Sequence, residues 1–228
     1  MKIDLNADVG EGCDDAALLP FVTSVNVACG LHAGSPAIID RTVRMALDRG
    51  LRVGAHPGWA DRDSFGRREL SLPAEEISSL VLYQVAALDG FARGRLTHVK
   101  PHGALYHQAA RDAAVARAIA EGVRRHRADL PLVGQGELLR AGLPALAEAF
   151  ADRRYLADGS LMPRSRPGAL LTDPAEAAAQ AVAIARDGFV VADGGARVPV
   201  AAQTLCIHGD TPGAPLIART VREALERL

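Results

Sequence analysis

The 228-residue sequence has few aromatic side chains, no excess charge of either sign and no long apolar run. Aromatic residues make up 4% of the chain, which argues against the stacking platforms that bind single-stranded nucleic acid. Lysine and arginine together number 26 against 27 aspartates and glutamates, a formal charge of −1. We therefore expect no basic surface for nucleic acid or an anionic membrane. No apolar stretch is long enough to cross a bilayer as a helix.

Several familiar nucleotide and hydrolase motifs are also absent. The chain has no G-x-x-x-x-G-K-[ST] phosphate-binding loop and no G-x-G-x-x-G dinucleotide fingerprint. It also lacks the H-E-x-x-H motif of zinc proteases and the G-x-S-x-G turn that presents a nucleophilic serine. Nothing in the sequence marks a nucleotide site.

Cysteine is scarce as well. Cys13, Cys29 and Cys206 are an odd number and lack C-x-x-C spacing, so neither a disulfide framework nor a structural zinc site is expected. The first residues lack the apolar core of a signal peptide. We therefore predict a cytoplasmic protein with reduced thiols, in which Cys29 is a small buried hydrophobe rather than a nucleophile.

What the sequence does contain is a repeated alternation of short β-like runs and longer helical patterns. Strands are predicted at residues 3–5, 24–28, 51–55, 97–100, 130–134, 155–157 and 203–207. Helices are predicted at residues 36–49, 72–93, 112–127, 138–150, 172–188 and 214–228, and a small hairpin at 189–192 and 198–201. No linker-like segment and no fixed-period repeat divides the chain. We predict one domain over residues 1–228.

Two folds fit this order of elements, a closed β/α barrel and an open doubly wound sheet, because both join parallel strands by right-handed crossovers. The polar residues favour the barrel. Reactive side chains follow almost every predicted strand, whereas an open sheet concentrates its site at one switch point. A barrel gathers residues from all its strand ends on one face. We therefore predict an α/β fold, a single TIM-like (β/α) barrel, with one polar pocket.

The first group of candidate residues follows the first and fourth predicted strands. Asp8 and Glu11 are available for base catalysis or cation binding, or they are solvated acids in a loop. Lys100 and His102 lie two positions apart at a strand end, a costly place for two such side chains. The lysine would neutralise a carboxylate or a developing oxyanion, or form a salt bridge that closes the barrel mouth.

The second group follows the later strands. His208 and Asp210 are predicted to form a pair, since a carboxylate commonly orients a histidine that acts as a base or binds a metal. An arginine near a site often clamps a substrate carboxylate, the role expected of Arg164. The catalytic candidates are thus Asp8, Lys100, His102, His208 and Asp210, and the substrate-binding candidates are Asn6, Glu11, His32, His56, Asp158 and Arg164. No residue is assigned to a metal.

Several of these residues lie in long motifs that resemble the LamB/YcsF family. The motifs are DLNADVGEG at 4–12, NVACGLHAG at 26–34, GAHP at 54–57, FGRR at 65–68, HVKPHGALY at 98–106, DGSLMPR at 158–164 and HGD at 208–210. The match runs in order over nearly the whole chain. The resemblance implies a seven-stranded barrel of the glycoside hydrolase and deacetylase type.

The resemblance also implies an activity. It implies ATP-dependent opening of 5-oxo-L-proline (pyroglutamate) to L-glutamate, together with 5-oxoprolinase subunits B and C. ATP would be a cosubstrate bound with those partners, and whether a metal takes part is left open.

The residue types suggest roles in such a reaction, and they leave two other functions open. Asp8, or His208 with Asp210, would activate water, while Lys100 and His102 would stabilise the developing negative charge. A metal-dependent deacetylase or amidohydrolase that acts alone is the first alternative, because aspartate and histidine also bind Zn²⁺. A non-catalytic subunit that binds a small carboxylate is the second.

Overall fold

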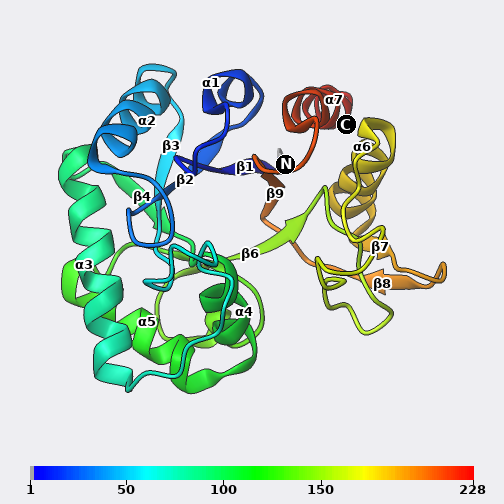
Figure 1. The fold of residues 1–228 in the computed structure, drawn as a ribbon. Coiled ribbons are helices and arrows are strands. Elements are labelled where there is room, and N and C mark those ends of the chain that lie inside the picture. Colours follow the sequence, from blue (N-terminus) through cyan, green and yellow to red (C-terminus); the bar gives the residue numbers. More distant parts are fainter. Residues whose placement is uncertain (1–2) are drawn as a thin grey trace. The chain divides into compact units, whose positions relative to one another are not determined.

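The computed structural model describes residues 3–228 and has an α/β architecture (Figure 1). Within these residues, seven strands form a closed barrel in the order β1-β2-β3-β4-β5-β6-β9. These strands are β1 (Asp4–Val9), β2 (Ser24–Ala28), β3 (Arg52–His56), β4 (Leu96–Val99), β5 (Leu132–Gly134), β6 (Ala145–Phe150) and β9 (Thr204–His208). A separate antiparallel sheet joins β7 (Phe189–Val191) and β8 (Arg197–Pro199). The predicted seven-stranded α/β barrel is confirmed.

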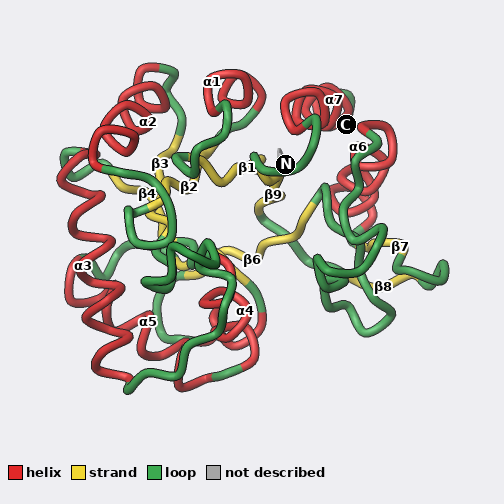
Figure 2. Tube along the Cα trace, viewed as in Figure 1, coloured by secondary structure: helices red, strands yellow, loops and turns green. Residues whose placement is uncertain are grey.

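Helices alternate with the barrel strands along the chain, as the colours of Figure 2 show. The α-helices are α1 (Asp15–Leu18), α2 (Pro36–Asp48), α3 (Ala74–Ala92), α4 (Gly103–Arg111), α5 (Ala113–His126), α6 (Pro174–Val182) and α7 (Ala214–Glu226). Short 3₁₀ turns, η1 (Leu19–Phe21) and η2 (Gly136–Arg140), and a π-helical turn, η3 (Ala183–Asp187), complete the set.

Local sequence explains where several helices begin. Ser35 accepts a hydrogen bond from the Ile38 amide, and Pro36 occupies the first helical position of α2. Asp112 and Asp173 cap α5 and α6 in the same way, because each side chain accepts hydrogen bonds from amides in the first turn of its helix. These side chains satisfy amides that have no partner within the helix, so the chain turns from loop to helix at these points.

The described chain divides into two compact units, each of which is considered by itself. The larger unit comprises residues 8–15 and 24–147. The smaller unit comprises residues 3–7, 16–23 and 148–228. Strands β1 and β6 each contribute residues to both units.

The larger unit packs side chains against glycines at close range. In the parallel pair β2–β3, Asn26 lies opposite Gly54, and His98 of β4 is also in register with Gly54. A Cβ atom added to Gly54 would lie 2.2 Å from His98 Nε2. The missing side chain therefore leaves the space through which His98 Nε2 reaches Asn26 Oδ1, at 2.8 Å.

The smaller unit is built on the parallel pair β6–β9, where Phe150 lies opposite Cys206. The buried Tyr155 returns to this pair, and its hydroxyl accepts a hydrogen bond from the Phe150 amide at 2.8 Å. The β7–β8 hairpin confirms the small hairpin predicted from the sequence.

One stretch of the prediction is wrong. Residues 138–150, expected to be helical, form η2 and then β6, and the sixth strand expected at 155–157 is only an isolated bridge between Tyr155 and Leu161. The β6 segment ALAEAF has residues of high helix propensity, but pairing with β5 and β9 overrides this local preference. Helix α4 lies in a stretch for which no element was predicted.

Of the helices described, none combines the length and the apolar character that a bilayer crossing requires.

The packing of α3 against α5 leads to a stability prediction. A Cβ atom on Gly122 of α5 would lie 2.5 Å from the Ser78 carbonyl oxygen and 2.9 Å from Val81 Cβ in α3. Gly122→Ala should therefore lower the free energy of unfolding by about 1–3 kcal/mol, as overpacking does. Urea denaturation followed by circular dichroism measures the change.

Gly90 of α3 is the matched control, since an added Cβ there meets nothing within 4 Å. Gly90→Ala should raise stability by up to about 1 kcal/mol, because alanine is the better helix former. Equal effects of the two substitutions would contradict the close approach of α5 to α3 at Gly122.

Candidate active site

Six of the predicted site residues lie in the larger unit, at or just beyond the ends of its strands. Asp8 is within β1 and His56 ends β3, while Lys100 follows β4. Glu11 and His32 lie in the loops after β1 and β2, and His102 precedes α4. The structure thus brings six residues spread over about ninety positions to one end of adjacent parallel strands.

Asp8 and Lys100 form a buried ion pair. Lys100 Nζ lies 2.9 Å from Asp8 Oδ1, and the two residues are 2% and 7% exposed, respectively. Asn26 Nδ2 donates to the same Asp8 oxygen at 2.8 Å, and His56 Nε2 lies 3.4 Å from Asp8 Oδ2. Asn26 was not predicted as a site residue. The sequence does indicate it, because Asn26 is the one residue with a carboxamide side chain in the otherwise apolar or small strand SVNVA.

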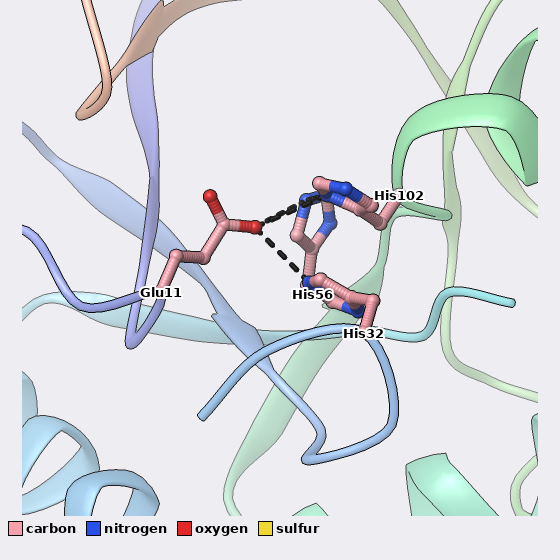
Figure 3. Close-up of side chains that lie close together, drawn as sticks. All are labelled: Glu11, His32, His56 and His102. Carbon is pink, nitrogen blue, oxygen red and sulfur yellow. Dashed lines mark hydrogen bonds and ion pairs between the residues drawn. The ribbon is translucent and has the colours of Figure 1, made fainter. Parts of the chain in front are cut away.

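Beside this pair lie Glu11, His32, His56 and His102, which we call the histidine cluster (Figure 3). Glu11 Oε1 lies 3.1 Å from His32 Nε2, 3.1 Å from His102 Nδ1 and 3.8 Å from His56 Nε2. The rings of His32 and His102 stack with centroids 3.8 Å apart, and the His56 ring meets His102 edge-on. All four side chains are buried, with at most 7% of each exposed to solvent.

Glycines make this crowding possible. A Cβ atom on Gly58 would lie 2.6 Å from His32 Nδ1. Gly66, whose φ is +64°, would place a Cβ 2.8 Å from His32 Cβ and 3.0 Å from His102 Cδ2. Only glycine fits at these two places, because the chain passes too close to the stacked rings for a side chain.

Burial and charge set the protonation of the cluster. Burial opposes ionisation of Glu11, but the close contacts of its carboxylate with His102 and His32 outweigh burial and hold the pKa of this carboxyl well below its usual range. Burial lowers the pKa of His32 to about 4 and also lowers the pKa of His102, despite the opposing effect of Glu11. For His56, attraction to Asp8 outweighs burial and raises the pKa. At neutral pH, Glu11 is ionised and His32 and His102 are neutral.

The remaining predicted residues lie in the smaller unit, and two of them have partners that the sequence did not indicate. His208 Nδ1 lies 3.0 Å from Asp152 Oδ1, a partner that the sequence did not indicate, and Asp210 lies 3.2 Å from Arg164. Asp152 is the second residue after β6. The mistaken helix at 138–150 concealed this position, since the other candidates were found at or near the ends of predicted strands.

Asp152 is fully buried, and several hydrogen bonds fix its carboxylate. It also accepts hydrogen bonds from the His208 amide at 3.0 Å and from Thr211 Oγ1 at 2.7 Å. Burial by itself would raise the pKa of Asp152, but attraction to His208 and these hydrogen bonds lower it to about 2. The arrangement fixes the orientation of the His208 ring, the role that the sequence had assigned to Asp210.

Asn6 and Asp158 lie outside these ion pairs. Asn6 Nδ2 donates to Thr204 Oγ1 at 2.6 Å and to Glu148 Oε1 at 3.1 Å, which ties β1 to β9 and β6 in the interior. Asp158 accepts hydrogen bonds from the amide and hydroxyl of Ser160, so its carboxylate closes an exposed turn.

Cys29 is buried, and burial raises the pKa of its thiol to about 12. The thiol is therefore protonated at neutral pH, which disfavours nucleophilic chemistry at this position.

Known proteins are similar to this chain along almost its whole length. The sequence model of the LamB/YcsF family matches residues 3–228. This chain belongs to the LamB/YcsF family. A relative in Methylococcus capsulatus, named as the A subunit of 5-oxoprolinase, is 53% identical over 238 residues, which cover 98% of this chain and 92% of the relative. A protein of the same name in Thermus thermophilus is 50% identical over 100% of this chain and 97% of that protein.

Solved structures agree with this family membership. The lactam utilization protein from Thermus thermophilus superposes with a TM-score of 0.92 at 49% identity, covering 100% of this chain and 97% of that one. A family 4 carbohydrate esterase from Streptomyces lividans has a TM-score of 0.54 at 11% identity, covering 99% and 88%. The second likeness shows a shared fold alone.

The buried Asp8–Lys100 pair of this LamB/YcsF-family chain leads to a second prediction. Lys100→Met would leave the Asp8 carboxylate buried without its ammonium partner, so we expect a loss of roughly 3–5 kcal/mol in the free energy of unfolding. The exposed pair Arg111–Glu69, with an N···O distance of 2.6 Å, is the control. Arg111→Met should cost at most about 1 kcal/mol. Denaturant unfolding compares the two, and equal losses would argue against a buried charge pair.

The low pKa of Asp152 predicts a pH dependence. Because the folded-state pKa is below the unfolded value of about 3.9, the stabilisation is complete above about pH 4 and is lost as the pH falls through about 2. Wild type should therefore melt above Asp152→Asn at pH 5, and the difference should shrink towards pH 2. Thermal melts across this range test it, and a difference that does not depend on pH would refute the assignment.

Proposed function

We propose that this chain is the A subunit of an ATP-dependent 5-oxoprolinase, which opens the lactam of 5-oxo-L-proline to L-glutamate with ADP and phosphate as the other products. The observation that carries the proposal is the similarity along almost the whole chain to proteins named as the A subunit of 5-oxoprolinase, at 50–53% identity. The word subunit in those names supports action within a complex, and we propose that the partners are subunits B and C.

The chemistry favours a division of labour among the subunits. An unstrained lactam is a poor electrophile, and transfer of the γ-phosphoryl group of ATP to its oxygen would make the ring carbon open to attack. The sequence of this chain has no phosphate-binding loop, so we assign ATP binding and phosphoryl transfer to the partners. Addition of one water to the activated carbon and cleavage of the C–N bond then give an acyl phosphate, and a second water hydrolyses it to glutamate and phosphate.

The larger unit has side chains suited to the addition of water. Lys100 places a buried positive charge 2.9 Å from Asp8, where it would stabilise negative charge that develops on the phosphorylated oxygen. Asp8 accepts the proton of the attacking water, and the neutral ring of His102 lies in the adjoining cluster. In the smaller unit, His208 held by Asp152 is the alternative base.

The histidine cluster favours a second candidate function. A carboxylate and three imidazoles within reach of one another are also suited to a metal-dependent hydrolase that works without partners or ATP. The lack of a nucleotide motif fits this candidate equally well, so an assay must separate the two.

None of the three cysteines, of which Cys29 and Cys206 are buried, forms a disulfide, and this supports the further proposal that the protein works in the reducing cytoplasm.

Glutamate release from 5-oxo-L-proline tests the proposal. We expect release with ATP only when this chain is mixed with subunits B and C, and none from either part alone. Release by this chain alone without ATP would favour the metal-dependent hydrolase. Full activity of the partners alone would reduce this chain to a non-catalytic role.

Within the active mixture, Asp8→Asn should lower kcat by about 10²- to 10⁴-fold, the range for loss of a general base. His126→Gln is the control, because this histidine also pairs with a carboxylate, Asp89 at 2.8 Å, but belongs to neither the ion pair nor the cluster. If Asp8→Asn is as active as the control, Asp8 is not the general base and His208 is the remaining candidate.

A further inference from the structure

The histidine cluster has a feature that its hydrogen bonds within the protein do not explain. One ligand atom from each of Glu11, His32, His56 and His102 lies within 4.8 Å of the other three. The four side chains come from four different loops or strand ends, and they point toward one another (Figure 3).

Backbone carbonyls fix the tautomers of two rings. His56 Nδ1 lies 2.7 Å from the Lys100 carbonyl oxygen, and His102 Nε2 lies 2.8 Å from the Phe65 carbonyl oxygen. A carbonyl only accepts hydrogen bonds, so both of these nitrogens carry the proton and donate it. In the neutral rings, the lone pairs are therefore on His56 Nε2 and His102 Nδ1.

Those two nitrogens face each other at 3.0 Å. Two lone pairs at this distance repel, and Glu11 Oε1 brings further negative charge to 3.1 Å from His102 Nδ1. A cation between these atoms would turn the repulsion into attraction. The pattern of an imidazole whose second nitrogen donates to a carbonyl is also the usual outer-shell arrangement of histidine metal ligands.

His32 completes the set. Its Nδ1 faces Gly58 and has no hydrogen-bond partner among the described residues, so Nε2 is the nitrogen directed at the cluster. Its ring is held parallel to that of His102 by stacking, with Gly66 passing beside both. The ring is therefore held in place by packing.

We propose that Glu11, His32, His56 and His102 together bind one divalent transition-metal ion, with Zn²⁺ as the best match. With bonds of about 2.0–2.1 Å, the ligand atoms of a tetrahedral zinc site lie about 3.3 Å apart. Four of the six separations among these atoms are 3.0, 3.1, 3.1 and 3.8 Å, close to that value, and all six are within 4.8 Å.

The donor set selects the class of ion. Three imidazole nitrogens and one carboxylate oxygen suit zinc and its first-row neighbours, whereas Mg²⁺ and Ca²⁺ prefer oxygen ligands throughout. One negative ligand leaves a bound divalent ion with a net positive charge, and the Asp8 carboxylate, 3.4 Å from His56 Nε2, lies next to it. Binding of the ion is independent of the proposed function, while its use to polarise a substrate oxygen rests on that function.

A single extra proton is the competing explanation. If His56 were an imidazolium, its Nε2 would donate to His102 Nδ1 and to the carboxylates, and no ion would be needed. Metal analysis separates these explanations, because only the metal site takes up a stoichiometric ion.

The test uses the full chain alone, without substrate, ATP or partners, so its outcome is distinct from that of the glutamate assay. The purified chain is stripped with a chelator and titrated with Zn²⁺ by calorimetry, and then with Co²⁺, whose visible absorption reports tetrahedral coordination. We expect one ion per chain and an intense tetrahedral Co²⁺ spectrum. A stripped, folded chain that takes up no stoichiometric ion would overturn the proposal in favour of the proton.

Variants identify the ligands. Glu11→Gln and His56→Gln should each weaken Zn²⁺ binding by at least about 100-fold. Substitution of a residue that only hydrogen-bonds to a metal ligand weakens binding by up to about 100-fold, and loss of a ligand itself should cost at least as much. His126→Gln should bind as wild type does. Circular dichroism confirms that each variant is folded. Two ligand variants are used so that the result does not depend on a single substitution. Unchanged affinity in both ligand variants would place any bound ion elsewhere and refute the site.

Discussion

The buried ion pair between Asp8 and Lys100 is the interaction on which the site in the larger unit depends. A carboxylate with 7% exposure is costly unless it is paired and hydrogen-bonded, and the Lys100 ammonium and the Asn26 amide supply both contacts to Asp8. Lys100 has a second role through its main chain. Its amide donates to the Ala55 carbonyl and its own carbonyl accepts from His56 Nδ1. One residue therefore neutralises the carboxylate and also fixes the tautomer of the neighbouring ring.

The histidine cluster shows how little freedom remains around that pair. Three rings and a carboxylate share a small buried volume, and close passage of the chain at Gly58 and Gly66 allows two of the rings to stack. Preorganisation of this kind is what a reactive or ligand-binding site requires, because polar groups that are already oriented need not reorganise when charge develops. The same rigidity implies that changes at the glycines would act on function through the positions of the rings.

The sequence predicted the barrel and most of its elements, and the errors have a common cause. The β6 segment ALAEAF predicts a helix because its residues have high helix propensity, and only its neighbours β5 and β9 make it a strand. That error hid Asp152, which lies just beyond the strand, and it led to the pairing of His208 with Asp210 instead. Asn26 was overlooked as a site residue for a related reason, since its importance comes from contacts with Asp8 and His98 that are distant in sequence.

By itself, the sequence determined the alternation of strands and helices, the polar residues at the strand ends and the motifs of the LamB/YcsF family. These are local properties, because periodicity, capping and motif spacing are all written in short stretches of chain. Only the tertiary structure decided which carboxylate holds His208, which nitrogen of each histidine faces Glu11 and which side chains are buried together. Those outcomes depend on strand register and side-chain packing between distant segments, where a shift of one residue would turn every side chain to the opposite face.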